Sequence, residues 1–393
     1  MRESWRWFGP NDPVTLAEIR QTGATDIVSA LHDIPIGEAW PQEAIAAHKA
    51  LIEAANTSMS PLHWTVVESI PVHEDIKLAA PDHEKFVEAW IESLRNLAAE
   101  GIKTICYNFM PVIDWTRTDL RYQLPSGAYA LRFDQDRFAA FDLFILRRDG
   151  AERDYSPDEA RRARTVFEAM SDLEADALTQ TIISGLPGKM TDAYSLEDFR
   201  QALARYCGID HDRLRANLLA FLAKVAPVAE TLDVKLAIHP DDPPWDMFGL
   251  PRVICTPDDL CKLFGAQPSP ANGMTLCVGT YGSRPDNDLP QMACEFAERI
   301  HFAHLRGVTR DPAEQRSFYE ADHLSSDIDM VSVVRNLLCN EQAQNREIFI
   351  RPDHGHVIMD DINKATNPGY SAIGRMKGLA EIRGVIRALS ASH

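Results

Sequence analysis

Short runs of β-branched, aliphatic and aromatic residues recur along the chain, and turn residues bound each run. Such runs are typical of short strands. The segments between them carry apolar residues at the spacing that is typical of amphipathic helices. Eight runs predict strands, at residues 4–9, 27–31, 64–68, 104–109, 234–239, 275–279, 300–305 and 348–351.

Two of the intervening segments show the helical pattern most clearly. In residues 81–99, one apolar stripe comprises Phe86, Ala89, Trp90, Leu94 and Leu97. Asp82 or a neighbour is expected to cap this helix at its start. Residues 213–231 predict a second, longer helix that is mostly apolar on one side.

Strands that alternate with helices predict a parallel sheet, and eight such strands are enough to close a barrel. We therefore expect an α/β protein, a (β/α)8 TIM barrel that forms a single domain over residues 1–393. An open, doubly wound sheet is the structural alternative. No GxGxxG motif follows the first strands, which argues against a dinucleotide-binding version of that alternative.

The interval between the strands at 104–109 and 234–239 is much longer than the others. Its residues 114–210 are rich in Asp, Arg, Glu and Ala and show helical periodicity. We expect a largely helical insertion within the barrel. In this fold, such an insertion lies over the C-terminal ends of the strands, where lids are found.

The chain is acidic, with a formal net charge of −18 over 393 residues. A nucleic-acid partner requires a basic stripe, which is absent from the sequence, whereas a small anion still fits where arginines gather locally. No apolar run approaches the roughly 20 residues that span a bilayer. The start of the chain has no signal-peptide core, and the seven cysteines form no CxxC pair. We expect a cytoplasmic protein with a small-molecule partner, forming a homodimer.

Four polar residues stand at or near the ends of successive predicted strands: His239, Cys277, His304 and Asp353. Their separations of 38, 27 and 49 residues each amount to about one βα unit. In a closed barrel, successive strand ends point one side chain each toward the axis. Imidazole, thiolate and carboxylate groups together bind divalent metals. Taken singly, each residue has an ordinary structural interpretation, such as a hydrogen-bonded histidine or a buried thiol.

Candidate acid–base groups follow the last of these residues. His356 lies three residues after Asp353, and Tyr370 lies on a turn just beyond. Either side chain can donate or accept a proton, although two solvated histidines and a packed tyrosine ring are the ordinary alternatives. His354 is instead a candidate for a hydrogen bond to one of the metal-ligating side chains. Glu320 and His323, on another polar loop, are weaker candidates for substrate contact.

Four further residues at strand ends are candidates for substrate binding: Arg6, Asn108, Arg306 and Arg351. A guanidinium group pairs with a carboxylate through two parallel hydrogen bonds, which suits an acidic substrate. Structural salt bridges with acidic neighbours are the alternative for the arginines.

Several stretches resemble the mannonate dehydratase family: residues 6–14 (RWFGPNDPV), 238–244 (IHPDDPP), 351–356 (RPDHGH) and 368–370 (PGY). They extend from the first strand to near the C-terminus, so the resemblance covers essentially the whole chain. It implies a xylose-isomerase-like barrel and a lyase, dependent on Mn²⁺ or Fe²⁺, that converts D-mannonate into 2-keto-3-deoxy-D-gluconate in glucuronate breakdown.

The resemblance also assigns roles to particular residues. It implies metal ligation by His239, Cys277, His304 and Asp353, and acid–base roles for His356 and Tyr370. A cysteine ligand favours Zn²⁺ or Fe²⁺ by its softness, whereas the family points to Mn²⁺. The alternatives are a metal-dependent sugar isomerase or epimerase on the same barrel, and a sugar-acid-binding module without catalysis.

Overall fold

Parallel strands close into a barrel in the computed structural model, which describes residues 1–54, 56, 60–183 and 195–391. The barrel order within these residues is β1-β12-β9-β8-β7-β4-β3-β2. The strands are β1 (Arg2–Arg6), β2 (Asp26–Ser29), β3 (His63–Glu68), β4 (Thr104–Tyr107), β7 (Lys235–Ile238), β8 (Asn272–Cys277), β9 (Ile300–His304) and β12 (Phe349–Arg351). Each predicted strand is present, and the predicted (β/α)8 barrel is confirmed.

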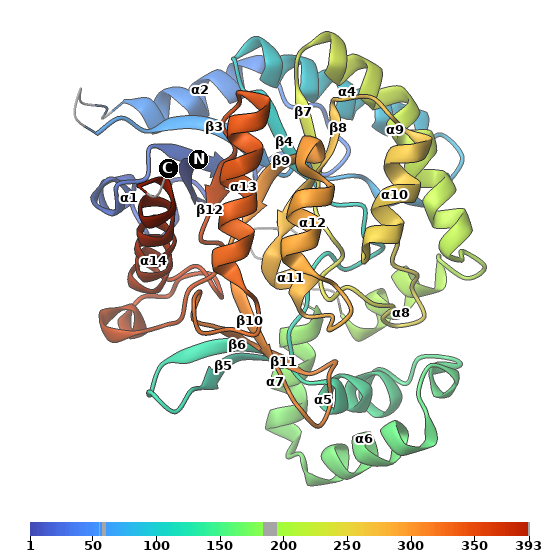
Figure 1. Ribbon diagram of the computed structural model, residues 1–393. Coiled ribbons are helices and arrows are strands. Elements are labelled where there is room, and N and C mark those ends of the chain that lie inside the picture. Colours follow the sequence, from blue (N-terminus) through green and yellow to red (C-terminus); the bar gives the residue numbers. More distant parts are fainter. Residues whose placement is uncertain (55, 57–59, 184–194, 392–393) are drawn as a thin grey trace.

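Helices surround the barrel, as Figure 1 shows. The outer helices are α1 (Leu16–Thr22), α2 (Gln42–Glu53), α4 (Glu84–Ala99), α9 (His211–Thr231), α10 (Pro257–Ala266), α12 (Leu289–Glu295), α13 (Met330–Gln344) and α14 (Ala372–Ser390). The predicted helices at 81–99 and 213–231 correspond to α4 and α9. Helix α4 buries Val87, Trp90, Leu94 and Leu97. Its N-cap residue is His83, which makes no side-chain cap hydrogen bond, so the expected capping interaction is wrong.

Short helical elements also lie in the loops outside residues 114–210. They are α3 (Glu74–Leu78), α11 (Val278–Gly282), and the 3₁₀ turns Ala297–Arg299 and Met359–Asn363. No helix among the described residues is long and apolar enough to cross a membrane.

The inserted segment 114–210 contributes both helices and strands. Its helices are α5 (Gln135–Ala140), a π-helical turn (Phe141–Leu146), a 3₁₀ turn (Ala151–Arg153), α6 (Pro157–Ala169), α7 (Asp172–Ile183) and α8 (Leu196–Ala204). Part of it, 184–194, lies outside the described residues. The segment also contains a hairpin that the sequence pattern does not predict, formed by β5 (Asp119–Gln123) and β6 (Tyr129–Phe133). Strand β5 has no fully buried residue, so its sequence lacks the hydrophobic pattern of a strand.

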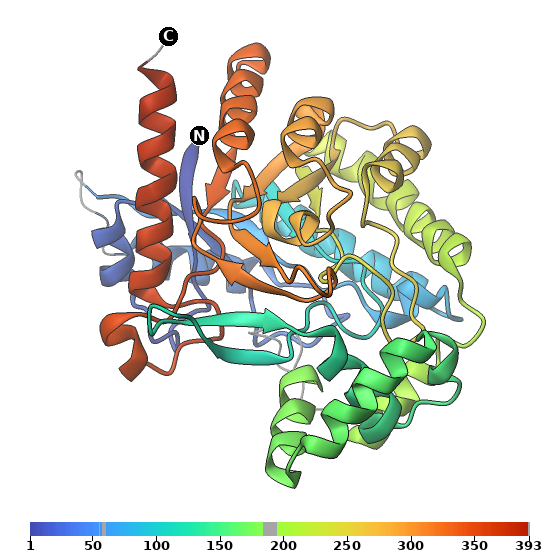
Figure 2. The same cartoon turned by 60° about the horizontal axis from the view of Figure 1, so that its bottom comes forward.

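This hairpin joins a second one in an antiparallel sheet. Strands β10 (Gly307–Arg310) and β11 (Phe318–Ala321) follow β9 directly, and β11 pairs with β6, giving the order β10-β11-β6-β5. Figure 2 shows the two hairpins side by side beneath one end of the barrel. Because β10 begins three residues after β9 ends, the sheet lies on the side of the C-terminal strand ends. Active sites of this fold lie at that end.

Candidate active site

Three of the predicted metal ligands lie close together at the C-terminal end of the barrel. Strand register aligns Cys277 on β8 with His304 on β9, and His304 with Arg351 on β12. His239 follows β7, the other neighbour of β8. His239, Cys277 and His304 each offer one ligand atom, and these three atoms lie within 4.8 Å of one another. The barrel thus brings together side chains that are far apart in sequence.

Asp353, the fourth predicted ligand, lies at the edge of this cluster. Its Oδ2 atom is 3.6 Å from Cys277 Sγ and 3.8 Å from His304 Nδ1. The same carboxylate pairs with two arginines, Arg306 Nε at 2.6 Å and Arg351 Nη1 at 2.5 Å. Burial alone would raise the pKa of Asp353, but Arg351, His354, His304 and Arg306 together hold it well below its usual range. Asp353 is therefore ionised at neutral pH.

The nitrogen atoms of this cluster are suited to a cation. His239 donates its Nδ1 hydrogen to the carbonyl oxygen of Pro240 at 2.7 Å, which leaves Nε2 as the ligand atom. Burial lowers the pKa of His239, so its ring is neutral, the form that binds a metal. His304 Nε2 is buried and has no hydrogen-bond partner among the described residues. Two imidazoles, a thiol and an adjacent carboxylate fit a divalent transition metal.

A second trio shares His304. Glu68, Cys106 and His304 also offer ligand atoms within 4.8 Å of one another. Burial raises the pKa of the Cys106 thiol well above its usual range, and Glu68 adds to the effect. A protonated thiol is a poor ligand. The first trio is therefore the better metal site.

Glu68 nevertheless belongs to the site, although it was not among the residues predicted from the sequence. It ends β3, and its Oε1 atom accepts from Arg351 Nη2 at 2.9 Å, while Oε2 lies 3.6 Å from His304 Nε2. Burial would raise the pKa of Glu68, but Arg351, His304 and Arg6 outweigh it and lower the pKa strongly. Its place at the end of a predicted strand was the available signal.

The predicted substrate residue Arg306 is buried in an ion-pair network. Its Nε, Nη1 and Nη2 atoms donate to Asp353 at 2.6 Å, Glu320 at 3.0 Å and Asp242 at 2.6 Å, respectively. Nη2 also donates to Thr280 Oγ1 at 2.8 Å. Because three carboxylates already occupy this guanidinium, it has no free fork for a substrate carboxylate. Arg306 positions carboxylates in this structure, and its substrate role stays a prediction.

The other predicted substrate residues lie around the same end of the barrel. Arg351 joins Asp353 to Glu68, as described above. Arg6 Nη1 donates to the main-chain oxygen of Glu68 and lies 3.7 Å from Glu68 Oε2. The Arg6 guanidinium also lies over the ring of Phe8, 4.9 Å from its centre. Asn108 is half-buried and directly follows β4.

The acid–base candidates differ in their surroundings. Tyr370 is buried, and its ring centre lies 5.1 Å from that of His354. His354 donates from Nδ1 to Glu320 Oε2 at 2.7 Å, and its Nε2 lies 3.8 Å from Asp353 Oδ1. His356 donates from Nε2 to the main-chain oxygen of Glu320 at 2.8 Å, and its Nδ1 faces Asp322 at 3.3 Å. Both histidines hydrogen-bond to Glu320 on β11, but His354 also lies near Asp353 and Tyr370, whereas His356 faces Asp322.

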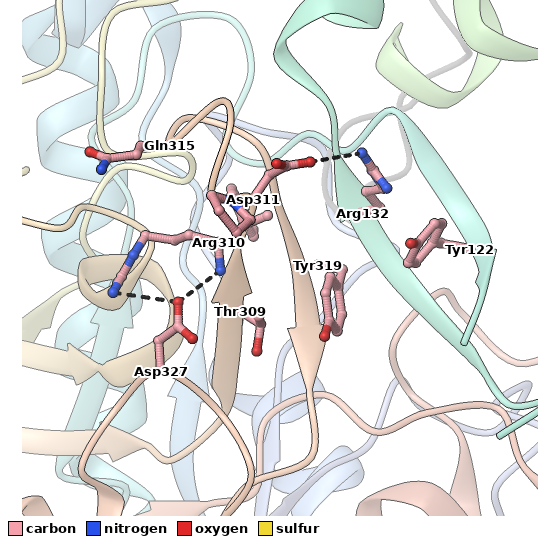
Figure 3. Close-up of a pocket in the computed structure, with 10 residues that line it drawn as sticks. Tyr122, Arg132, Thr309, Arg310, Asp311, Gln315, Tyr319 and Asp327 are labelled. Atoms are coloured by element: carbon pink, nitrogen blue, oxygen red, sulfur yellow. Dashed lines mark hydrogen bonds and ion pairs between the residues drawn. The ribbon is translucent and has the colours of Figure 1, made fainter. Parts of the chain in front are cut away.

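A separate pocket of about 440 Å³ lies on the antiparallel sheet and contains none of the predicted site residues. Its charged groups are paired, Arg132 with Asp311 at 3.7 Å and Arg310 with Asp327 at 3.4 Å, as Figure 3 shows. The chemistry of the barrel mouth is therefore distinct from this pocket.

Comparison with known proteins identifies the family. The family model D-mannonate dehydratase (UxuA) matches residues 1–393. The mannonate dehydratase of Chromohalobacter salexigens is 54% identical, with 99% of each chain covered. That of Marinomonas sp. (strain MWYL1) is 53% identical, with 98% of each chain covered.

Solved structures give the same result. The crystal structure of mannonate dehydratase from Streptococcus suis serotype2 matches with a TM-score of 0.76 at 36% identity, covering 100% of this chain and 95% of that one. A xylose isomerase-like TIM barrel protein from Mycobacterium smegmatis, in complex with magnesium, matches with a TM-score of 0.50 at 13% identity, covering 98% and 97% of the two chains, and shares the fold. The resemblance in the sequence motifs is thereby confirmed, and the chain belongs to the D-mannonate dehydratase family.

Proposed function

We propose that this chain, a hydro-lyase of the D-mannonate dehydratase family, acts in glucuronate breakdown at a divalent cation, Mn²⁺ or Fe²⁺. It removes water from D-mannonate to give 2-dehydro-3-deoxy-D-gluconate. His239, Cys277, His304 and Asp353 would bind the cation. The observation that carries the proposal is the convergence of two imidazoles and a thiol within 4.8 Å beside an ionised carboxylate.

The reaction makes clear demands on the site. Dehydration of a 2,3-dihydroxy acid removes the C2 proton and the C3 hydroxyl group, and the resulting enol becomes the keto acid. The C2 proton is only weakly acidic beside a carboxylate, so a base must take it, and an acid must protonate the departing hydroxyl. A divalent cation, when bound, supplies positive charge that stabilises the enolate-like anion.

Tyr370 fits the proton donor of this pair. Burial raises the pKa of its phenol to about 12, although Arg351 acts in the opposite direction. The phenol therefore keeps its proton at neutral pH and can donate it to the departing hydroxyl group.

A histidine would then be the base that accepts the C2 proton. We propose His356, and His354 is the competing candidate because its contacts lead to Tyr370 and Asp353. The variants H354Q and H356Q separate the two. Loss of the base lowers kcat by about 10²–10⁴-fold, whereas loss of a residue that only shapes the loop has a smaller effect.

The direct test of the function is an assay of the purified protein. D-mannonate and Mn²⁺ are added with and without a chelator, and the 2-keto acid is detected. We expect product that disappears with the chelator and returns with Mn²⁺ or Fe²⁺. Product formation that is insensitive to the chelator would contradict the metal requirement. Aldose–ketose interconversion in place of keto-acid formation would favour an isomerase.

The cytoplasmic location and the homodimer are further parts of this proposal. The first is supported by the seven cysteines, which are all free thiols in the structure. Light scattering of the purified protein tests the second.

A further inference from the structure

Arg117 from the inserted segment is buried against Asp242 and Glu320, two carboxylates that also pair with Arg306. Its side chain is 0% exposed, and its guanidinium contacts two aromatic rings, 4.7 Å from the centre of Trp115 and 5.0 Å from that of Phe318. It donates to both carboxylate oxygens of Asp242, at 2.8 and 3.2 Å, and to Glu320 at 2.8 Å. A buried arginine held this rigidly carries a full positive charge in a region of low dielectric constant.

The two carboxylates that bind Arg117 also bind Arg306, and Arg306 reaches two of the proposed metal ligands. It donates directly to Asp353, and it donates to Thr280 Oγ1, which lies 3.1 Å from Cys277 Sγ. A continuous chain of ion pairs and hydrogen bonds therefore runs from the insertion to the cluster.

The charges of this network balance in the part of the chain that the structure describes. Its carboxylates are Glu68, Asp242, Glu320 and Asp353, and its arginines are Arg6, Arg117, Arg306 and Arg351. With four charges of each sign, these carboxylates and arginines balance, with His304 and His354 counted as neutral imidazoles. A divalent cation would add two positive charges, and a thiol that coordinates a metal loses its proton, so one net positive charge would remain for one substrate carboxylate.

We propose that Arg117 is a positioning residue that sets the charge of the barrel mouth, so that the site accepts one cation and one singly charged sugar acid. This inference rests on the metal site of the proposed function. Arg117 does not touch the substrate in this scheme, and it acts through Asp242, Glu320 and Arg306.

Opposite effects on Mn²⁺ affinity and on substrate affinity distinguish this role from a general loss of structure. The variant R117Q removes one positive charge and leaves Asp242 and Glu320 less neutralised. We expect R117Q to bind Mn²⁺ about tenfold more tightly and to show a KM for mannonate about tenfold higher, the effect of one charge several ångströms away in a partly buried site. Mn²⁺ binding is measured by titration of the metal-free protein, followed by electron paramagnetic resonance.

Two further variants complete the experiment. R117K keeps the positive charge but lacks the paired N–H donors of the guanidinium. We expect its Mn²⁺ dissociation constant and its KM for mannonate to lie within about threefold of wild type. E320Q removes one negative charge, so we expect weaker Mn²⁺ binding and a lower KM for mannonate. This variant provides the test if R117Q does not fold. Arg132 on β6 is the matched control, because its side chain is 23% exposed and pairs with Asp134 at 2.9 Å. R132Q leaves both constants within twofold of wild type.

The outcomes separate this inference from the proposed function. If R117Q weakens Mn²⁺ and substrate together, or changes neither, the charge-setting role of Arg117 is wrong while the metal site stands. If the wild-type protein binds no Mn²⁺, the proposed metal site and this inference are both wrong.

Discussion

Tyr370 is held on several sides by aromatic and cationic side chains. Its ring meets Phe8 edge-on, with ring centres 4.7 Å apart, and the Arg375 guanidinium lies 5.3 Å from its centre. Arg375 also donates to the main-chain oxygen of Tyr370 at 3.0 Å and to that of Arg6 at 2.8 Å. These contacts fix the ring through its faces, its edge and its main chain, so they do not require the hydroxyl group.

Removing that hydroxyl therefore tests chemistry rather than packing. We expect Y370F to lower kcat by about 10²–10⁴-fold, the usual contribution of a positioned proton donor, with unchanged metal content. Turnover and metal content are measured on the same preparation. Y122F, in the pocket of Figure 3, is the control and keeps full activity. Turnover of Y370F within twofold of wild type would remove Tyr370 from the mechanism.

Removal of a proposed metal ligand should release the metal. We expect H239A to lose bound metal, measured by elemental analysis after dialysis, while its fold persists. D353A also loses metal, but it leaves Arg306 and Arg351 without a shared partner, so its unfolding free energy falls by about 3–5 kcal/mol. H211A is the control, because His211 pairs with Asp246 at the surface. Full metal retention in both ligand variants would contradict the assignment.

The sequence reveals some residues of the site and hides others, for a physical reason. His239, Cys277 and His304 are visible because barrel topology brings neighbouring strand ends together, so their position along each βα unit is informative. Arg117 is hidden, because its partners Asp242 and Glu320 lie 125 and 203 residues further along the chain. An ion pair of that kind depends on how the insertion packs, which local pattern does not encode.

At the scale of elements, helix α14 supports the loop that carries His354 and His356. A Cβ atom on Gly374 of α14 would overlap the main-chain oxygen of His356, and one on Gly355 would overlap the main chain of Arg375. The helix and the loop thus approach each other closely because both contact positions lack side chains.

This contact gives a paired prediction for two glycines of one helix. G374A pushes α14 away from the 354–356 loop, so we expect a lower melting temperature and a lower kcat. G384A lies on the exposed side of the same helix, where a Cβ would meet no described atom within 4 Å. We expect G384A to raise the unfolding free energy by about 0.5–1 kcal/mol through helix propensity. Equal effects of the two substitutions would contradict the close packing of α14 on the loop.

The sequence predicts the strands and helices of the barrel better than the hairpin of the insertion. The barrel strands are visible because each is a short apolar run, and α4 and α9 because each has a stripe of helical period. The sequence does not predict the β5–β6 hairpin, because β6 pairs with β11 in the fold and β5 has no fully buried residue. Tertiary pairing of this kind overrides local pattern.

The barrel also buries titratable groups outside the site. His301 on β9 is buried, and its Nδ1 donates to the main-chain oxygen of Leu236 at 2.8 Å. Burial lowers the pKa of His301 to about 3 and that of His48 to about 4. Both rings are therefore neutral in the folded protein throughout the neutral and mildly acidic range.

These histidines predict how stability depends on pH. The unfolded chain binds a proton on each histidine near pH 6.5, whereas folded His301 does so only near pH 3, so stability is full above pH 6.5 and is lost as the pH falls through this window. Between pH 6.5 and pH 5, His301 alone costs about 2 kcal/mol of unfolding free energy. Denaturant unfolding of metal-free protein at these two pH values measures the loss. In H301Q the same interval costs correspondingly less, and an H301Q curve parallel to wild type would show that His301 is not the group responsible.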